Sequence, residues 1–356
     1  MTGDKIRVLI VDDSSFMRNI LGRMIEKETR FEVVGKAKNG EEGVAMTLEL
    51  KPDIVTMDIE MPVMDGMTAL SQIMEKCPTP VLMVSSLTEE GAQATLECLE
   101  KGAVDFIPKA LQDKDRNIFH VSDTLHEKLI AASKAHVGGR IRPSAPVVGK
   151  PEPVKAARPS STARMAQAEI LVVGSSTGGP KALQSFLPKL PQNLRVPVVI
   201  AQHMPANFTA AMAARLDGVC HLNVVEGTHG QEIESGTVYV APGGLHTRVM
   251  KNGSGYVLDI SPDKGGESVY HPSVDILADS ASEALAGKAV AVMFTGMGSD
   301  GAKGFTSLAN QGAYVIAQDE ETSVVYGMPK SVVEAGITKE ILPLEDIAPA
   351  VIRLLS

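Results

Sequence analysis

The chain has 356 residues, of which 44% are hydrophobic and 22% charged, a composition typical of a soluble globular protein. This length exceeds what one hydrophobic core usually organises, so we expect two domains and a connector. The formal net charge of −9 argues against a general nucleic-acid-binding protein, because phosphate contacts need a basic face. No stretch approaches the roughly 18 apolar residues of a membrane span, and no apolar signal-like run opens the chain, so we expect a cytoplasmic protein without membrane insertion.

The three cysteines, Cys77, Cys98 and Cys220, form no CxxC pair. No group of histidines lies at metal-ligand spacing along the sequence either. The sequence therefore predicts neither a disulfide framework nor a zinc site.

The first 136 residues alternate apolar, β-branched runs with amphipathic stretches. The predicted strands are Ile6–Val11, Phe31–Gly35, Asp53–Met57, Pro80–Val84 and Val104–Ile107, and a last helix is predicted within Gln112–His136. Continuous apolar strands of this kind are covered by helices on both faces. The pattern therefore predicts an α/β domain, with a five-stranded parallel, doubly wound sheet.

Polar residues that can carry chemistry follow four of these strands. They are Asp12 and Asp13 after the first strand, Asp58 after the third, Ser85 after the fourth and Lys109 after the fifth. Clustered carboxylates repel one another unless a hard cation lies among them, which predicts a Mg²⁺ site. The metal and Lys109 can neutralise a phosphoryl group on Asp58, while the hydroxyl of Ser85 binds its oxygens. Helix capping, as by Asp13 or Ser14, explains single residues of this set but not all five.

Residues 4 to about 130 resemble a response-regulator receiver domain. The matching motifs are VLIVDDS, DIVTMDIEMPVMDG, LMVSS and GAVDFIPK. The resemblance implies that Asp58 accepts a phosphoryl group from a histidine kinase and that Asp12, Asp13 and Asp58 hold Mg²⁺. It also implies that Ser85, Phe106 and Lys109 respond to phosphorylation. Ala110 stands where many members have Pro.

Residues 137–166 contain five prolines, six Lys or Arg and a single acidic residue. Such a composition is typical of a flexible linker. We therefore expect domains at residues 1–136 and 167–356.

The second domain repeats the alternation of apolar strands and helical patterns. Its predicted strands are Glu169–Val173, Val196–Ala201, Ala289–Phe294 and Tyr314–Ala317. The Asn252-Gly253 pair between two alternating runs predicts a β-hairpin. We expect a Rossmann-like, doubly wound α/β domain with this hairpin inserted.

The first strand of this domain runs into Gly174-Ser175-Ser176-Thr177-Gly178, which has G-x-S-x-G spacing centred on Ser176. A serine at such a strand-to-helix turn is exposed, and the N–H groups at the helix start can stabilise an oxyanion. Taken alone, the segment is equally compatible with a phosphate-binding glycine loop. Ser175 is the alternative nucleophile.

Two further strands supply partners for a serine nucleophile. His203 follows the strand that ends in AQH, and Asp300 follows the strand that ends in VMF. Strand ends of one parallel sheet meet at one edge, which is the arrangement that a nucleophile, a base and an orienting carboxylate need. Asp300 is also a candidate N-cap for the helix that follows it. The chain order Ser, His, Asp differs from that of the α/β-hydrolases.

With GSSTGGP, QHMP, VAPGG and FTGMGSDGA, the whole chain resembles the chemotaxis protein-glutamate methylesterases of the CheB family. The resemblance implies hydrolysis of glutamate γ-methyl esters on chemoreceptors with release of methanol, and in many members deamidation of glutamines. It implies Ser176 as nucleophile, His203 as base and Asp300 as orienting group, with Met297 and Thr177 in the oxyanion region. No cofactor is expected for the esterase. Ser175 and Ser299 replace the Ala and Asn that are common at these positions.

Two alternatives of other classes are a nucleotide-binding module that uses the glycine loop and a DNA-binding output domain. The first lacks a clear acidic ribose contact about 20 residues further on, and the second lacks a basic recognition helix. For the esterase, a receiver placed before it predicts gating. The unphosphorylated receiver should cover the strand ends near Ser176, and phosphorylation of Asp58 should release it.

Overall fold

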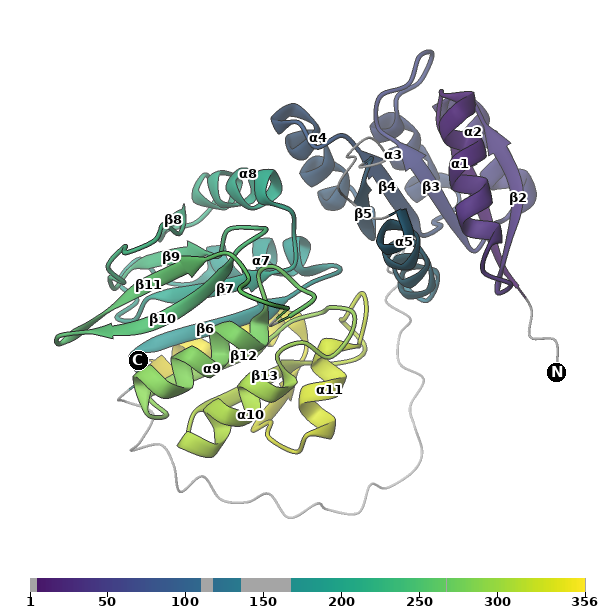
Figure 1. The fold of residues 1–356 in the computed structure, drawn as a ribbon. Coiled ribbons are helices and arrows are strands. Elements are labelled where there is room, and N and C mark those ends of the chain that lie inside the picture. Colours follow the sequence, from purple (N-terminus) through teal and green to yellow (C-terminus); the bar gives the residue numbers. More distant parts are fainter. Residues whose placement is uncertain (1–4, 110–117, 136–167, 267, 356) are drawn as a thin grey trace, which may run out of the picture.

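The computed structural model describes residues 5–109, 118–135, 168–266 and 268–355. They form two α/β domains, which lie against each other (Figure 1). The predicted linker, residues 137–166, lies outside the described residues. No helix in the described ranges is long and apolar enough to cross a membrane.

The N-terminal domain has five parallel strands in the order β2-β1-β3-β4-β5. Its strands are β1 (Ile6–Val11), β2 (Phe31–Ala37), β3 (Ile54–Asp58), β4 (Val81–Ser85) and β5 (Asp105–Pro108). Its helices are α1 (Ser15–Glu26), α2 (Gly40–Leu50), α3 (Gly66–Lys76), α4 (Glu89–Glu100) and α5 (Ile118–Ser133). The predicted sheet is confirmed, and all five predicted strands are present. This strand order places a switch in chain direction between β1 and β3, where ligands bind in doubly wound sheets.

The C-terminal domain has a seven-stranded, fully parallel sheet in the order β14-β13-β12-β6-β7-β9-β8. Its strands are β6 (Ile170–Ser175), β7 (Val198–Gln202), β8 (Asn223–Glu226), β9 (Thr237–Val240), β12 (Ala289–Met293), β13 (Tyr314–Gln318) and β14 (Glu340–Leu342). Its helices are α7 (Gly179–Phe186), η1 (Leu187–Lys189), α8 (Ala206–Asp217), α9 (Val274–Leu285), α10 (Ala302–Gln311), α11 (Met328–Glu334) and α12 (Leu344–Leu355). The predicted hairpin is a separate antiparallel pair, β10 (His246–Asn252) and β11 (Gly255–Ser261).

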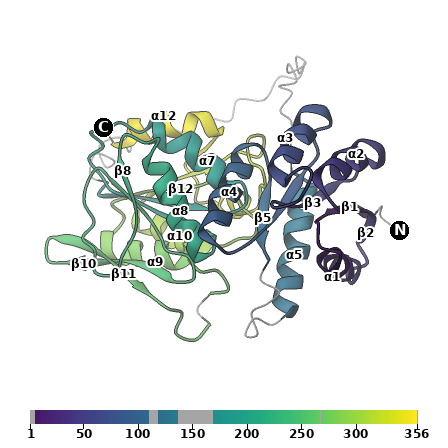
Figure 2. The ribbon, with the colours of Figure 1, turned by 90° about the horizontal axis from the view of Figure 1, so that it is seen from above.

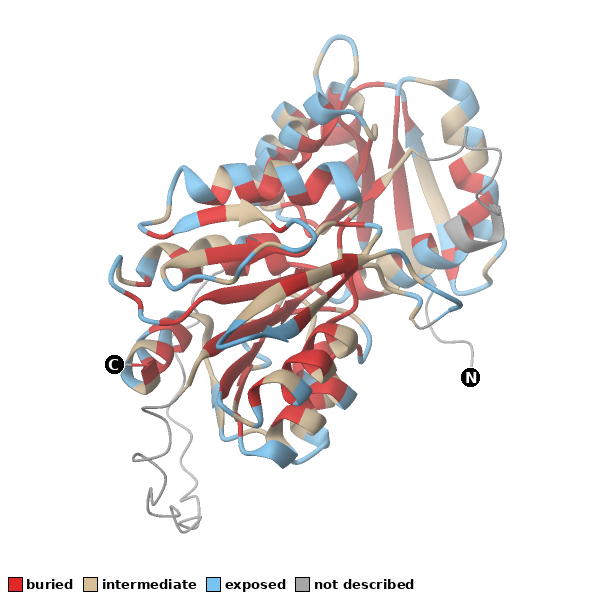
Figure 3. Ribbon diagram, turned by 60° about the vertical axis from the view of Figure 1, so that its left-hand side comes forward, coloured by how far each residue is buried: buried red, intermediate tan, exposed pale blue. Residues whose placement is uncertain are grey.

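The sheet of the C-terminal domain is buried on both faces (Figure 3). Helices α7, α8 and α12 pack on one face, and α9, α10 and α11 with the hairpin pack on the other. Because both faces are covered, β6 and β7 consist of buried residues throughout, which explains their continuous apolar sequences. Strand β6 lies between β7 and β12. The strands that follow β6 directly in the chain are added on one side of it, and the later strands β12, β13 and β14 are added on the other side. The carboxyl ends of β6, β7 and β12 therefore share one crevice.

Apolar packing continues from one domain into the other. One buried cluster contains residues of the N-terminal sheet, with Phe106, and residues of the C-terminal domain, with Phe208. The two rings stack with centroids 4.3 Å apart. Helix α4 lies against α7 and α8, as Figure 2 shows from above.

Candidate active site and acidic site

Ser176 lies directly after β6, in the turn that leads to α7. Its side chain is half-buried, and its N–H donates to Thr295 O at 3.1 Å. Gly178 is the N-cap of α7 with φ +78°, a left-handed conformation that favours glycine. A Cβ atom on Gly179 would lie 2.0 Å from Gln202 Oε1, so only glycine lets the turn pass this close to β7. The turn therefore presents Ser176 at the strand end, as the motif predicts.

His203 lies beside Ser176 because β6 and β7 are parallel neighbours. Ser175 pairs with Gln202, and the N–H of His203 donates to Ser175 O at 3.1 Å. The amide of Gln202 donates to Ser176 O at 2.9 Å and to His203 O at 3.1 Å. Gln202, which the sequence did not single out, thus fixes the backbones of both residues relative to each other.

The hydroxyl of Ser175 donates to Gln202 Oε1 at 2.6 Å, and Ser175 is fully buried. Ser175 is therefore part of the support beneath the turn, and its side chain is closed to a substrate. The geometry favours Ser176 over Ser175 as nucleophile.

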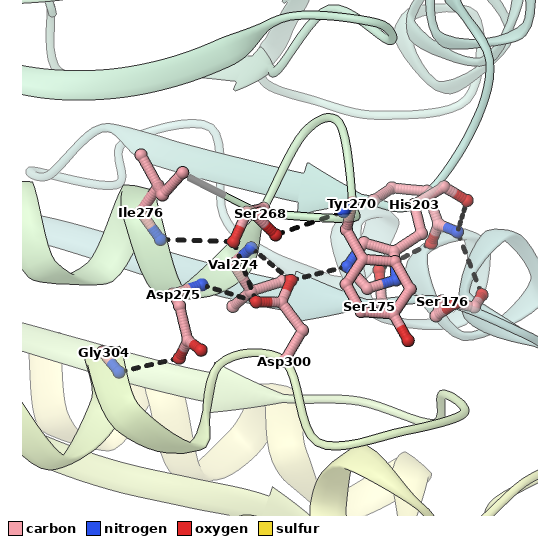
Figure 4. A network of polar contacts seen from close by, with 12 residues as sticks. Ser175, Ser176, His203, Ser268, Tyr270, Val274, Asp275, Ile276, Asp300 and Gly304 are labelled. Carbon is pink, nitrogen blue, oxygen red and sulfur yellow. Dashed lines mark hydrogen bonds and ion pairs between the residues drawn. The ribbon is translucent and has the colours of Figure 1, made fainter. Parts of the chain in front are cut away.

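Asp300 pairs with the imidazole of His203 (Figure 4). The Nε2–H of His203 donates to Asp300 Oδ2 at 2.7 Å, which leaves Nδ1 as the ring acceptor. Nδ1 is buried and has no hydrogen-bond partner among the described residues. A buried lone pair of this kind is costly unless it is paired, so Nδ1 is the ring atom that can accept a proton.

The sequence suggested that Asp300 could cap α10, the helix that follows it. Its carboxylate instead lies at the N-terminus of α9, and the N-cap of α10 is Gly301. It accepts hydrogen bonds from Val274 N at 2.6 Å, Asp275 N at 3.1 Å and the Ser273 hydroxyl at 2.8 Å. Burial acts to raise the pKa of Asp300, but the hydrogen bonds from His203 and these N–H groups hold that pKa below its usual value. Asp300 is therefore an anion that fixes the tautomer of His203.

The two residues expected in the oxyanion region have different surroundings. Met297 lies in the loop after β12, and neither its N–H nor that of Thr177 donates a hydrogen bond within the described chain. Both groups are therefore available to a developing oxyanion. The hydroxyl of Thr177 is engaged elsewhere, since it donates at 2.5 Å to Asp105 Oδ2 of the N-terminal domain.

Tyr270 was not identified from the sequence. Its ring stacks on the imidazole of His203, with centroids 4.2 Å apart and an interplanar angle of 5° (Figure 4). The stack excludes water from one face of the base and restricts its rotation. Tyr270 lies in the segment between β11 and α9. The course of this segment cannot be predicted from the sequence pattern, so the contact with His203 could not be predicted either.

The acidic residues of the N-terminal domain meet at the β1–β3 switch point. Carboxylate oxygens of Asp12, Asp13 and Asp58 all lie within 4.8 Å of one another. Lys109 Nζ donates to Asp58 Oδ2 at 2.6 Å and lies 3.9 Å from Asp12 Oδ2. Asp12 Oδ2 is buried without a hydrogen-bond partner among the described residues, which fits a bound cation. These residues can hold Mg²⁺.

Electrostatics supports the same conclusion. Burial and the neighbouring charge of Asp58 raise the pKa of Asp12 to about 6, and burial raises the pKa of Asp58 in spite of Lys109. Ionised carboxylates are thus destabilising here until a cation neutralises them.

Asp12→Asn is therefore expected to raise the free energy of unfolding by about 1–3 kcal/mol at pH 8 without Mg²⁺. Because the folded protein holds this proton more tightly than the unfolded chain, the free energy of unfolding falls as the pH rises from about 4 to about 6, and this loss persists above pH 6. The advantage of the variant should shrink as the pH falls from about 7 towards 4. Urea denaturation at several pH values measures this. Asp13→Asn is the matched control, since Asp13 is an exposed member of the same cluster and its charge is only the last of the causes that raise the pKa of Asp12. A destabilised Asp12→Asn at pH 8 would contradict the prediction.

Two of the predicted switch residues contact other parts of the structure. The hydroxyl of Ser85 bonds to Gly91 O and Thr95 of α4, and Phe106 packs between Phe208 and the ammonium group of Lys128. The structure thus brings Lys109 to Asp58 but joins Ser85 to α4 and Phe106 to the other domain.

The domain contact lies next to the candidate active site. Asp105, which accepts from Thr177, is also paired with Lys128 at 3.0 Å. Glu100 of α4 is paired with Arg215 of α8, and this ion pair lowers the pKa of Glu100. None of these cross-domain partners was predicted, because each pair is separated by 72 or more residues.

A crevice of about 630 Å³ lies between the domains. Helix α5 forms one wall, with Glu127, Ile130 and Lys134, and Tyr270 and Met297 line the other. A bulky substrate that approaches the candidate active site by this route would meet α5.

The two halves of the chain match two family models. Residues 171–351 match the CheB methylesterase model, and residues 8–117 match the response regulator receiver domain model.

Relatives that match nearly the whole chain carry the name of the same enzyme family. A protein-glutamate methylesterase/protein-glutamine glutaminase of Oleidesulfovibrio alaskensis is 45% identical over 98% of this chain and 99% of its own, and one of Geobacter sulfurreducens is 43% identical over 98% of both. The solved catalytic domain of Thermotoga maritima CheB methylesterase is 41% identical with a TM-score of 0.51, and covers 52% of this chain and 98% of its own. The family expected from the motifs is confirmed: the chain belongs to the CheB methylesterases, with a receiver domain before the catalytic domain.

Proposed function

We propose that the chain hydrolyses glutamate γ-methyl esters on chemoreceptors at Ser176 and releases methanol. The observation that carries the proposal is the buried Nδ1 of His203, which has no hydrogen-bond partner among the described residues. Asp300 orients this imidazole, and Gln202 holds the backbone of His203 next to that of Ser176. The names of the relatives, protein-glutamate methylesterase/protein-glutamine glutaminase, support hydrolysis at protein glutamates and extend it to protein glutamines. The chain then acts at the cytoplasmic side of the receptors.

In the first half of the reaction, the Ser176 hydroxyl attacks the ester carbonyl while His203 Nδ1 takes its proton. Asp300 stabilises the imidazolium that forms. The N–H groups of Thr177 and Met297 donate hydrogen bonds to the carbonyl oxygen as negative charge develops on it. His203 then protonates the departing methoxide, and water repeats the sequence on the acyl-enzyme.

In the receiver domain, Asp58 accepts the phosphoryl group from a histidine kinase. Asp12, Asp13 and Asp58 hold Mg²⁺, which neutralises charge on the phosphoryl oxygens when bound. Lys109 already contacts Asp58 and stabilises the product carboxyl phosphate. Movement of Ser85 towards the new oxygens would break its bonds to α4, and α4 carries the Glu100 contact to the catalytic domain. Phosphorylation thereby weakens the domain contact.

The proposal is tested by methanol release from methylated receptor, with and without a small phosphodonor and Mg²⁺. We expect the phosphodonor to raise the rate and a fluorophosphonate probe to label Ser176, identified by mass spectrometry. A nucleotide-binding module would instead show no labelling and a thermal shift with nucleotides. Labelling of Ser175 alone would contradict the assignment of the nucleophile.

A further inference from the structure

A second polar cluster lies in the catalytic domain, outside the Ser176 site. It consists of His246 at the start of β10, with Asp263 and His271 from the segment between β11 and α9. One ring nitrogen of each histidine and one carboxylate oxygen all lie within 4.8 Å of one another. The two histidines are 25 positions apart in the sequence, so they show no metal-ligand spacing. This is why the sequence predicts no zinc site.

The distances within the cluster bring three possible metal ligands together. His271 Nε2 lies 3.4 Å from Asp263 Oδ2, and His246 Nε2 lies 3.8 Å from Asp263 Oδ1. The first contact is a hydrogen bond longer than the usual N–H···O range of about 2.7–3.2 Å, and the second is an ion-pair contact. Ligands around a tetrahedral zinc ion, with bonds of about 2.0–2.1 Å, lie roughly 3.3–3.4 Å apart. The ligand atoms of the cluster lie within 4.8 Å of one another, so they have to draw together by up to about 1.4 Å, from at most 4.8 Å to about 3.4 Å, around an ion.

The surroundings are those of a built site with an open side. The side chain of His246 is fully buried, whereas those of Asp263 and His271 are 20% and 31% exposed. Asp263 Oδ2 also accepts from Gly266 N at 3.0 Å, which orients the carboxylate from behind. An ion can thus enter from solvent and meet ligands that are already oriented.

We propose that His246, Asp263 and His271 bind a divalent transition metal, with zinc as the occupant. Two imidazoles and one carboxylate favour zinc over Mg²⁺ or Ca²⁺, which prefer oxygen ligands. The bound ion joins β10 to the segment that carries Tyr270 and Ser273. Since Tyr270 stacks on His203 and Ser273 bonds to Asp300, the metal fixes the support of the catalytic pair. Metal binding itself does not depend on the proposed esterase activity.

The test uses the full-length chain without an affinity tag, treated with a chelator and kept in excess Mg²⁺ so that the receiver carboxylates are filled. Titration with Co²⁺, followed by its visible absorption, is expected to show one tetrahedral ion per chain, displaced by Zn²⁺. His271→Gln and Asp263→Asn should each weaken binding at least about 10-fold. Zinc should raise the melting temperature of the wild type and leave that of His271→Gln unchanged.

Two variants serve as controls. His221→Gln removes an exposed histidine of the same domain, and Asp58→Asn removes a receiver carboxylate, so both should bind Co²⁺ like the wild type. Circular dichroism shows whether each variant is folded. Absence of a tetrahedral cobalt spectrum, or unchanged affinity in folded His271→Gln, would overturn the proposal.

Discussion

Ser176→Ala should lower methanol release by about 10³-fold or more, because removal of a nucleophile leaves only binding and oxyanion stabilisation. The Michaelis constant should change little, since Ser176 contributes its hydroxyl to chemistry rather than to substrate binding. Steady-state methanol release from methylated receptor, with excess phosphodonor, measures both quantities.

Ser175→Ala is the matched control, one residue away in the same turn. It removes the 2.6 Å hydrogen bond to Gln202 and leaves that amide oxygen unsatisfied, so we expect lower stability by about 1–3 kcal/mol but retained chemistry. Near-normal turnover in Ser176→Ala, combined with loss of turnover in Ser175→Ala, would reverse the assignment of the nucleophile.

Removal of residues 1–140 should raise the basal esterase rate by at least about 10-fold, the result of displacing a docking equilibrium by about 1.4 kcal/mol. Helix α5 forms a wall of the crevice beside Met297, so its loss opens the route to Ser176. The catalytic domain of a relative has been solved alone, which supports folding of the truncated chain. Initial rates without phosphodonor measure the effect.

Two full-length variants distinguish occlusion from other forms of control. Asp58→Asn should keep the basal rate and lose the response to phosphodonor, because it removes the acceptor without touching the domain contact. Arg215→Ala should raise the basal rate modestly, since it breaks a partly exposed ion pair with Glu100. A truncated chain no faster than the unphosphorylated whole would exclude occlusion and leave stimulation or recruitment by the receiver.

The sequence predicted the central part of both sheets because buried parallel strands are continuous apolar runs. It did not predict β8, β9 or β14. Strands β8 and β14 are short edge strands of four and three residues whose side chains are largely half-buried or exposed, so they carry no continuous apolar run. The buried interior strand β9 has four residues, as many as the predicted strand Tyr314–Ala317, but the next element after it is β10. It therefore lacks the alternation of strand and helix by which the other strands were predicted.

For the site, strand ends placed Ser176, His203 and Asp300 together, since one edge of a parallel sheet collects them. What the sequence could not provide is set by loops and by tertiary contacts. Which of the two ring nitrogens of His203 bonds to Asp300 depends on how α9 packs against the loop after β12. The stack of Tyr270 on His203 depends on the course of the segment after β11, and no local periodicity records it.

Asp105 and Thr177 join β5 of the receiver to the turn that carries Ser176. Coupling between two sites is reciprocal, so any factor by which phosphorylation favours substrate binding is also the factor by which bound substrate favours phosphorylation. If a bound substrate separates these two residues, it shifts the phosphorylation equilibrium of the receiver domain in the same direction as phosphorylation shifts substrate binding. At equilibrium, the phosphorylated fraction of the protein would then be larger where its substrate is abundant.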